Sequence, residues 1–475
     1  MTSLDAAVVD DLRGLRAQLA SSPDASSLRP VGLREIVRGS GAVSGLADVL
    51  RRLGVADEAS VTVLSDATPK KYADRDVLEV VVEAVGTHHI IAVELLRSST
   101  PGGILQADET TVSNAVTRVT SHASDVLVSV GSGTVTDIAK VVAGELGLSH
   151  VVVQTAASVN GFSDDQSVLL INGAKRTTPS RWPDVLVIDP LVIAHAPLAM
   201  ATSGLGDQLS MFTASADWYL ANAVGFDTSF SPALVSMMRE GVDALIAVSN
   251  QLAHGEPQPV SNLADCLARG GIAMGAAGRT APSSGLEHTI SHLLEMHADA
   301  NDERSASHGS QVGAASVFGA LVWRRVQRRL DEGNVTLLES NVATRERVLD
   351  AFNHLDGSGA TARECWNLYE QKAKWIRSHM LDLTRVVNEW SQHSARVNEL
   401  LQPVDVVATA LRNAGAPLSF RQLNPAPRRE VVTWAIRNCH LLRDRFGILD
   451  LADLMGVWSH DDAAATLNEL DELAR

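Results

Sequence analysis

Four side chains beyond residue 200 are candidate metal ligands: Asp207, His288, His292 and His308. His288 and His292 are four residues apart in a helix-forming stretch, so their imidazoles project from one helix face. One carboxylate and two neutral imidazoles leave a coordination position free on a divalent ion, as a catalytic Lewis-acid site requires. Two histidines at this spacing are also common as partly buried polar residues, and the spacing alone leaves both interpretations open.

A second motif, residues 126–140 (VLVSVGSGTVTDIAK), has the pattern of a buried strand, a glycine-containing turn and a helix. Free backbone N–H groups of Gly131, Ser132 and Gly133, together with the positive end of the following helix, can bind a pyrophosphate. Glycines also serve any tight turn, so the motif alone is a weak signal. Asp137 and Lys140 on one face of that helix favour nucleotide binding, because a plain turn uses neither.

Asp66 directly follows a predicted strand, residues 61–65. A carboxylate in this place can accept hydrogen bonds from a ribose diol and disfavours a 2′-phosphate, which favours NAD over NADP. A surface turn explains the residue equally well, and the neighbouring Lys70 and Lys71 could still accommodate a phosphate.

The composition limits the class of protein. The chain has 475 residues, 45% of them hydrophobic, and its 40 basic and 56 acidic residues give a net charge of −16. This charge repels nucleic acid and anionic lipid. Cys266, Cys365 and Cys439 form no CxxC pair, and the sequence has neither a signal-peptide pattern nor a long apolar run. We therefore expect a cytoplasmic protein with no disulfide framework, no nucleic-acid partner and no membrane partner.

Residues 35–190 alternate short β-branched runs with amphipathic stretches, which predicts an α/β fold with a parallel sheet. The expected strands are 35–38, 61–65, 89–94, 125–130, 150–154 and 185–188, and the expected helices include 44–53, 111–122 and 135–146. Asn172-Gly173 predicts a hairpin between 167–171 and 175–178. After Pro197 the strand signals stop. We expect an N-terminal helix and linker (1–30), a nucleotide-binding domain (31–195) and a helical domain for metal and substrate (196–475).

Six motifs together, in chain order, resemble the sn-glycerol-1-phosphate dehydrogenases: GSGTVTDIAK, TAASVNGFSDD, NGAKRT, SGLGDQLSMFTASADW, SGLEHTISHLLEM and SHGSQVGAASVFGA. This family lies within the glycerol dehydrogenase, iron-containing alcohol dehydrogenase and dehydroquinate synthase-like superfamily. The stretches ECWNLYEQKAKWIR and RNCHLLRDRFGILDLADLMGVW resemble the bacterial branch associated with arabinose operons. The resemblance covers about residues 35–460.

The resemblance implies a dehydroquinate synthase-like fold, in which a Rossmann-like parallel-sheet domain precedes an all-helical domain and the active site lies in the cleft between them. It implies a homodimer or larger oligomer. It assigns one divalent ion, with zinc expected first and nickel or iron also possible, to Asp207, His288 and His308. His292 then becomes a neighbouring or proton-relay residue. The implied contacts of NAD or NADP are Asp66, Gly131, Ser132, Gly133, Asp137, Lys140, Thr155 and Ser158.

The implied reaction is the interconversion of dihydroxyacetone phosphate and sn-glycerol 1-phosphate with NAD(P)(H), a step of phospholipid metabolism. Lys175 and Arg176 are the candidates for binding the substrate phosphate, and His292 or a water is the candidate proton donor. A structural ion pair or solvent-exposed charge at the hairpin is the alternative for the two basic residues.

The sequence departs from the family at Asn160, where relatives commonly have an aspartate that contributes to substrate binding. An amide can hydrogen-bond a hydroxyl but cannot act as a base. This change keeps another polyol, or a phosphorylated or phosphonate carbonyl compound, open as the substrate. A dehydroquinate synthase-like sugar-phosphate cyclase and a non-catalytic protein on the same scaffold are the further alternatives.

Overall fold

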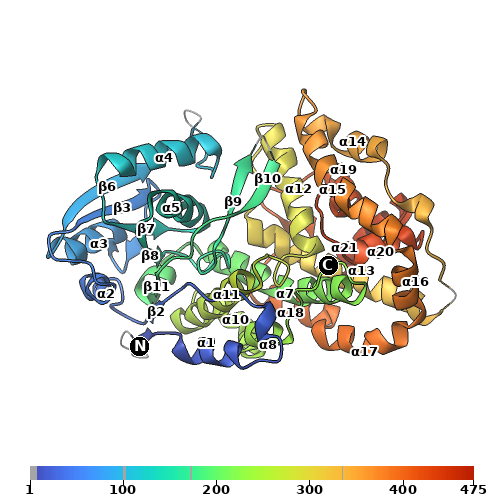
Figure 1. Cartoon of the computed structure of the whole chain (residues 1–475), viewed down its shortest axis with the longest axis horizontal. Helices are drawn as coiled ribbons and strands as arrows, with labels where there is room; N and C mark the ends of the chain where they lie inside the picture. Colours follow the sequence, from blue (N-terminus) through green and yellow to red (C-terminus); the bar gives the residue numbers. More distant parts are fainter. Residues whose placement is uncertain (1–7, 100–102, 172–173, 334) are drawn as a thin grey trace. The chain divides into compact units, whose positions relative to one another are not determined.

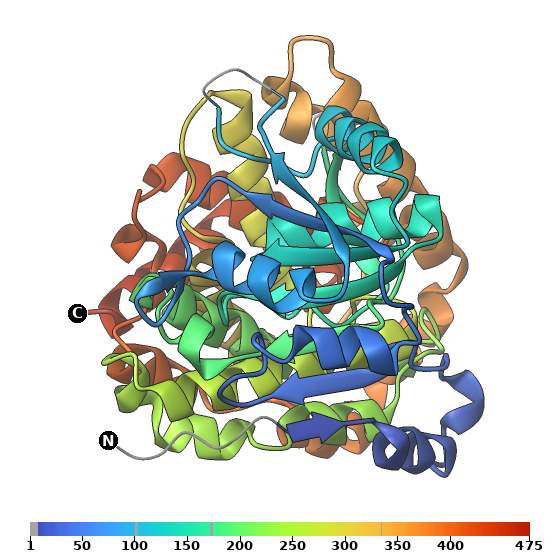
Figure 2. The ribbon, with the colours of Figure 1, turned by 90° about the vertical axis from the view of Figure 1, so that its left-hand side faces the viewer.

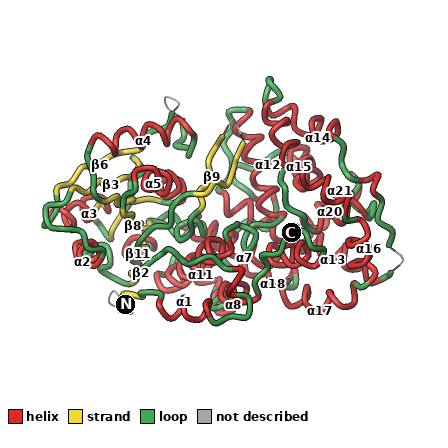
Figure 3. The backbone as a smooth tube through the Cα atoms, in the orientation of Figure 1, coloured by secondary structure: helices red, strands yellow, loops and turns green. Residues whose placement is uncertain are grey.

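The computed structural model describes residues 8–99, 103–171, 174–333 and 335–475 (Figure 1). The chain divides into two compact units. Unit 1 contains the described residues of Met1–Ile171, Lys175–Gly204 and Pro232–Arg279, and unit 2 contains those of Asn172–Ala174, Leu205–Ser231 and Thr280–Arg475. Strands lie only in the part of the described chain that precedes Pro190, and helices make up the regular structure after it (Figure 3).

Unit 1 is built on a seven-stranded sheet with the order β1-β2-β11-β8-β7-β3-β6. Its strands are β1 (Val8–Asp10), β2 (Glu35–Arg38), β3 (Ser60–Asp66), β6 (Ile90–Leu96), β7 (Val126–Gly131), β8 (Ser149–Gln154) and β11 (Val185–Ile188). All neighbours pair in parallel except β1, which lies antiparallel to β2 at one edge (Figure 2). The predicted α/β fold with a parallel sheet is confirmed, and β1 is an addition that the pattern did not predict.

Helices cover both faces of this sheet, which explains why its central strands are continuous apolar runs. Helices α2 (Leu46–Arg52) and α3 (Val77–Gly86) pack on one face, and α4 (Glu109–Ser121) and α5 (Gly133–Leu146) pack on the other. In β7 every residue is buried, with Val126, Val128 and Val130 facing one helical layer and Leu127 facing the other. The sheet is thereby fixed as a rigid platform for the loops at its carboxyl edge.

The strand order reverses between β3 and β7. From β3 the chain continues to β6 on one side, whereas β7 is followed by β8 and then β11 on the other side. The carboxyl ends of β3 and β7 are therefore adjacent, and their connections lead away in opposite directions. In doubly wound α/β sheets this switch point is where ligands bind. Asp66 and the glycine turn that starts at Gly131 lie at these two strand ends.

Two small sheets and a short N-terminal helix complete the regular structure of unit 1's first part. Strands β9 (Gln166–Ile171) and β10 (Ala174–Pro179) form the predicted two-stranded sheet, while the predicted turn at Asn172-Gly173 lies outside the described residues. Strands β4 (Lys71–Tyr72) and β5 (Arg75–Asp76) were not predicted. The expected N-terminal helix is α1 (Arg13–Ala20), and a single 3₁₀ turn, Ala25–Ser27, lies in the expected linker.

The division into units differs from the predicted boundary at 195/196, because a group of helices after it belongs to unit 1. These helices are α6 (Pro190–Ile193), α8 (Pro232–Arg239), α9 (Val242–Ala247), α10 (Ser249–Leu252) and α11 (Pro257–Ala277). Glycines let α11 approach the N-terminal part closely: a Cβ on Gly275 would lie 2.2 Å from the Trp182 ring, and one on Gly278 would lie 2.2 Å from the Arg29 guanidinium group. This packing joins segments that composition alone assigned to different domains.

The remaining helices form unit 2, together with all but the first turns of α7 (Leu198–Ala223). They are α12 (Leu286–Ala300), α13 (His308–Asp331), α14 (Arg345–Phe352), α15 (Ala360–Ser378), α16 (Met380–Asn388), α17 (Trp390–Leu400), α18 (Val404–Asn413), α19 (Arg429–Asn438), α20 (Ile448–Leu454) and α21 (His460–Leu473). Among the described residues, none of the helices combines the length and apolar character that crossing a membrane requires.

Candidate active site

The three predicted metal ligands come together in unit 2. Asp207, His288 and His308 offer ligand atoms that all lie within 4.8 Å of one another. The Nε2 atoms of His288 and His308 lie 3.3 Å and 4.0 Å from the same carboxylate oxygen of Asp207. Asp207 is 1% exposed, whereas a larger part of His308 reaches the surface. The cluster is thus anchored in the core and open on the side of His308.

Three helices bring these ligands together, because α7 carries Asp207, α12 carries His288 and α13 starts at His308. Close packing of α7 on α13 depends on glycine. A Cβ on Gly206 would lie 2.2 Å from the carbonyl oxygen of Gly309, and one on Gly313 would lie 2.9 Å from the Gly206 Cα. A methyl group at these positions would push the helices apart and separate the carboxylate from His308.

Each of the two ligand histidines contacts a further carboxylate through its other ring nitrogen. His288 Nδ1 lies 3.1 Å from Glu287 Oε1, and His308 Nδ1 lies 3.1 Å from Glu295 Oε1. Both glutamates are buried, and Ser291 Oγ is also 3.2 Å from His308 Nδ1. Such contacts hold the proton on Nδ1 and direct the Nε2 lone pair towards a metal ion. Sequence reasoning missed Glu287 and Glu295, although both lie in the motif SGLEHTISHLLEM.

The electrostatics of the cluster fit a bound cation. Burial alone would lower the pKa of His288, but its hydrogen bonds to Asp207 and Glu287 and their charges raise that pKa to about 9. The imidazole thus becomes the positive charge that the carboxylates require. A divalent ion can take this role with one carboxylate oxygen and two imidazole nitrogens, a mixed ligand set suited to zinc, iron or nickel. We conclude that the donor set fits one divalent metal ion.

His292, the predicted proton-relay residue, also lies in this cluster. It is one helical turn after His288 on α12 and is 3% exposed. Its ring centroid lies 5.6 Å from that of His308. The structure therefore places His292 beside the three ligand candidates and among buried groups.

Asp217, which sequence reasoning did not single out, supports the same cluster from α7. Its carboxylate accepts hydrogen bonds from the backbone N–H groups of Leu286 at 3.3 Å and Ile448 at 3.0 Å. These are the first residues of α12 and α20, where N–H groups lack partners within their own helix. Burial, and then the charge of Glu287, raise the pKa of Asp217 to about 8. The residue joins the start of the His288 helix to the C-terminal helices.

The predicted nucleotide loop lies in unit 1 at the switch point of the sheet. Gly131 ends β7, Ser132 precedes α5 in an extended conformation, and Gly133 begins the helix. The Ser132 side chain makes no capping hydrogen bond to the helix. A Cβ on Gly131 would lie 2.4 Å from Val135, so the tight turn itself requires glycine. This arrangement presents a helix N-terminus at the strand end, as pyrophosphate binding requires.

Asp66 lies at the adjacent strand end, as predicted, but it has protein partners. Its carboxylate oxygen Oδ1 accepts a hydrogen bond from the Thr68 N–H at 2.9 Å and forms an ion pair with Lys70 Nζ at 2.5 Å. Lys70 Nζ also contacts the Thr68 carbonyl oxygen at 2.9 Å. The ion pair therefore places one negative and one positive side chain where the adenosine ribose of a dinucleotide would lie.

Lys140 and Asp137, both predicted to contact the cofactor, have another role in the structure. Lys140 is fully buried, and its Nζ donates to Asp164 Oδ1 at 2.6 Å, to the Gly161 carbonyl oxygen at 2.9 Å and to the Gln166 carbonyl oxygen. Asp137 lies 3.2 Å from the same ammonium group. An ammonium group has three protons, and these acceptors use all of them. We therefore reassign Lys140 from cofactor contact to anchoring the 161–166 loop on α5.

The loop that Lys140 anchors carries the other predicted contacts of unit 1. Thr155 follows β8 and donates its N–H to the Gly131 carbonyl oxygen at 3.2 Å, which ties the loop to the nucleotide turn. Ser158 and Asn160 are largely buried, at 4% and 9% exposure. A Cβ on Gly271 of α11 would lie 2.4 Å from the Asn160 carbonyl oxygen, so the loop packs tightly on that helix.

The predicted phosphate-binding pair, Lys175 and Arg176, lies on β10 in unit 1. Both side chains are partly exposed. The structure thus places the predicted cofactor and phosphate residues in unit 1 and the predicted metal ligands with His292 in unit 2.

Comparisons with known proteins agree with this fold. Residues 37–197 match the family model described as iron-containing alcohol dehydrogenase. The chain is 27% identical to a glycerol-1-phosphate dehydrogenase [NAD(P)+] of Bacillus licheniformis, with 85% of this chain and 84% of the relative covered. It is 28% identical to the protein of that name from Bacillus subtilis, with 74% and 82% covered.

A probable glycerol dehydrogenase from Sinorhizobium meliloti has a similar fold, with a TM-score of 0.56 and 15% identity over 92% of this chain and 96% of that one. The family match falls on the sheet with the nucleotide turn, and the relatives extend over the helices with the metal cluster. These similarities identify the chain as an NAD(P)-dependent alcohol dehydrogenase, whose residues 37–197 are similar to the iron-containing alcohol dehydrogenases.

Proposed function

We propose that this enzyme interconverts dihydroxyacetone phosphate and sn-glycerol 1-phosphate, with NAD(P)(H) as the redox partner and one divalent ion at Asp207, His288 and His308. The convergence of these three ligands, with a buried glutamate at the Nδ1 atom of each histidine, is the observation that carries the proposal. The names of the relatives support the substrate. Zinc is the first candidate for the ion, and Asp66 favours NAD as the coenzyme.

The chemistry needs few protein groups. When bound, the divalent ion polarises a carbonyl and the nicotinamide supplies a hydride. Asp207, His288 and His308 would hold the ion, while Glu287 and Glu295 keep the two imidazoles in the tautomer with a free Nε2. The buried surroundings of Asp207 exclude water from the inner side of the cluster.

His292 is the residue that we assign to proton transfer. Histidine is the side chain that most often acts as a general acid or base in enzymes. The place of His292 one turn after His288 puts it beside the substrate's oxygen in this proposal. Exchange of His292 for glutamine is then expected to lower kcat far more than the affinity for the metal ion.

Seven residues of unit 1 are assigned to binding. The turn of Gly131, Ser132 and Gly133 would hold the pyrophosphate of the coenzyme at the start of α5. Lys175 and Arg176 would bind the substrate phosphate, because adjacent basic residues can clamp a phosphate from two sides. Thr155 and Ser158 lie in the loop beyond the nucleotide turn and complete the proposed coenzyme site.

Asn160 favours a second candidate, a dehydrogenase for a different polyol or for a phosphorylated or phosphonate carbonyl compound. Its amide can both donate and accept a hydrogen bond but carries no charge. In this candidate the metal ion, the coenzyme and His292 keep their roles, and only the substrate changes.

A single assay distinguishes the candidates. The purified protein is loaded separately with Zn²⁺, Ni²⁺ or Fe²⁺ and mixed with dihydroxyacetone phosphate and either NADH or NADPH. Loss of nicotinamide absorbance that disappears in Asp207→Ala, and that persists in Asp350→Asn on the exposed face of α14, is the expected result. Turnover of another phosphorylated carbonyl compound in place of dihydroxyacetone phosphate would favour the second candidate. Binding of coenzyme without net oxidation would favour a cyclase.

We further propose a cytoplasmic homodimer or larger assembly. Sedimentation of the metal-loaded protein tests the assembly, since a single species of about 50 kDa at micromolar concentration would exclude it.

A further inference from the structure

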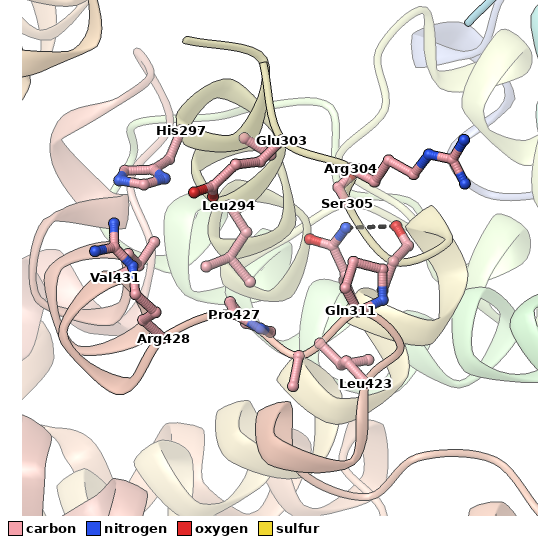
Figure 4. A pocket seen from close by; sticks show the side chains of 14 residues that line it. Leu294, His297, Glu303, Arg304, Ser305, Gln311, Leu423, Pro427, Arg428 and Val431 are labelled. Carbon is pink, nitrogen blue, oxygen red and sulfur yellow. Dashed lines mark hydrogen bonds between the residues drawn. The ribbon is translucent and has the colours of Figure 1, made fainter. Parts of the chain in front are cut away.

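Unit 2 contains a pocket of about 340 Å³ beside the two helices that carry the histidine ligands. Its walls come from the end of α12, the segment between α12 and α13, the first turn of α13, and the stretch that leads into α19 (Figure 4). This volume lies in the range of pockets that bind small organic molecules. None of Asp207, His288, His292 and His308 lines it.

Polar side chains gather at one end of this pocket. Figure 4 shows His297, Glu303 and Arg428 close together there, while Gln311 and Leu423 lie at the other end. Among the described residues, neither Arg428 nor Glu303 forms a side-chain hydrogen bond or an ion pair with another protein group. Both residues are exposed to solvent, so their charged groups are accessible to a ligand that enters the pocket.

His297 gives an independent indication of a ligand. The residue is only 8% exposed and lines the pocket, yet its ring nitrogens make no hydrogen bond among the described residues. Its ring instead contacts the rings of Trp434 and His354. Burial lowers the pKa of His297 despite the nearby Glu303, so the neutral imidazole offers one donor and one acceptor. The two ring nitrogens are not among the fully buried atoms without a partner, so they are accessible from the pocket that His297 lines and can hydrogen-bond a ligand there.

Much of the remaining lining is apolar. Arg304, Ser305 and Gln311 also belong to the lining, and the guanidinium group of Arg304 points away from His297 and Arg428 (Figure 4). Leu294 and Ala298 from α12, with Leu423, Pro427 and Val431 from the C-terminal segment, form the apolar part of the lining. A ligand that fills it therefore needs a compact hydrocarbon body as well as a charged head.

The charges select the head group. Arg428 attracts an anion, and its planar guanidinium group matches the two oxygens of a carboxylate. Glu303 repels a second negative charge in the same place, which disfavours a phosphate dianion. We propose that this pocket is a second ligand site of the enzyme, which binds a small organic carboxylate with Arg428 and His297 on its head group and the apolar lining around its body.

The site is separate from the metal centre. His297 lies nine residues after His288 on α12, about 13 Å along the helix axis. The other end of the pocket is closer to the metal ligands, because Ala306 and Gln311 flank His308 in the chain. A three-carbon substrate held at Asp207 cannot span the distance to His297, so a molecule bound to His297 is a different one.

The experiment measures binding of 3-phenylpropionate to the full-length, metal-loaded protein by calorimetry. Acetate tests the head group alone, 3-phenylpropanol tests the body alone, and phenyl phosphate tests a dianion. 3-Phenylpropionate is expected to bind tightest of the four. Arg428→Gln should weaken it about tenfold or more, because a charged hydrogen bond is lost. His297→Phe should weaken it severalfold while it keeps the aromatic contacts.

Two further variants control the result. Arg377→Gln removes an exposed arginine on α15 outside the pocket and should leave the affinity unchanged. Glu303→Gln should strengthen binding of phenyl phosphate more than that of 3-phenylpropionate. Absence of 3-phenylpropionate binding, or equal binding to the wild type and Arg428→Gln, would overturn the proposal. Loss of dehydrogenase activity on its own would not affect it, because the pocket contains no residue of the proposed mechanism.

Discussion

Unit 1 and unit 2 each bury a cluster of carboxylates, and the two clusters differ in the source of their positive charge. In unit 1, Asp137 and Asp164 lie 3.2 Å and 2.6 Å from the ammonium group of Lys140. In unit 2, Asp207 and two glutamates contact the imidazoles of His288 and His308. The ammonium group of Lys140 keeps its charge and uses all its protons within the protein, whereas the imidazole of His288 can give up its Nε2 proton and bind a metal ion instead. The first cluster is therefore complete as a structural element, and the second is suited to an added cation.

This difference shows how to separate structural from functional clusters in a sequence with many acidic residues. A permanent cation of the chain inside the cluster indicates anchoring. Imidazoles whose outer nitrogens contact carboxylates indicate a metal site. The following predictions test the comparison.

The largest effect is expected for Asp207→Ala. This change removes the carboxylate that lies near the Nε2 atoms of both histidines. Turnover should therefore be lost, and Zn²⁺ affinity should fall by more than about 100-fold. Competition with a coloured chelator measures the affinity. Asp350→Asn, which removes an exposed carboxylate from the same unit, should retain the wild-type value. Tight binding of one equivalent of Zn²⁺ by Asp207→Ala would contradict the proposed metal site at Asp207, His288 and His308.

Lys140→Met should affect the stability of the fold rather than the affinity for metal. It leaves the buried Asp164 and the partly buried Asp137 without their cation, for which the expected cost is about 3–5 kcal/mol. Thermal unfolding measures the effect, and the double variant Lys140→Met/Asp164→Asn should recover part of it. Zn²⁺ affinity should stay as in the wild type. A wild-type melting temperature in Lys140→Met would show that the lysine does not anchor the loop.

The outer carboxylates of unit 2 should have an intermediate effect. Glu287→Gln and Glu295→Gln keep the shape of each side chain but weaken the hold on the imidazole proton, so each should lower Zn²⁺ affinity about 10–100-fold. Glu430→Gln on the exposed side of α19 is the matched control. If the two variants behave like this control, the contacts at Nδ1 do not tune the metal site.

The smallest effect is a pH dependence of unit 1. Burial raises the pKa of Asp137 from 3.8 to about 6, although the charge of Lys140 opposes this shift. The folded state then binds the proton more tightly than the unfolded state, so the stabilisation is complete below pH 3.8 and is lost as the pH rises through 6. Compared with Asp137→Asn, the wild type should lose a few degrees of melting temperature over this window. If the melting temperatures of the wild type and Asp137→Asn change with pH in parallel, the raised pKa of Asp137 would be contradicted.

Local patterns predicted the sheet and the nucleotide turn well. The β-branched runs identified the six parallel strands, because strands buried on both faces leave an apolar signature. The positions of Asp66 and Gly131 at neighbouring strand ends followed from the strands that precede them. The order of strands and the pairing of β1 with β2 depend on contacts between distant segments, and the sequence pattern contains no signal for them.

Residue types and spacing predicted the metal cluster in part. His288 and His292 are one turn apart, and Glu295 follows His288 by seven residues, so it lies on the same helix face and could have been included. Lys140, in contrast, is a residue whose role the sequence pattern could not predict. Its partner Asp164 is 24 residues away in a loop, and no periodicity connects a helix to a loop contact. Without that contact, a lysine near a glycine turn resembles a phosphate ligand.

The two hydrogen bonds of Asp217 have a consequence for the order of folding. They join residues that are 69 and 231 positions apart, to the first turns of α12 and α20. Closing a long loop costs chain entropy before its contacts can offset that cost, so such pairs form late. The helix that bears His288 can form early by itself, but its first turn is fixed only when the segment around Ile448 has folded. Uptake of a metal ion during refolding should therefore report this last long-range closure, and not the appearance of the helix.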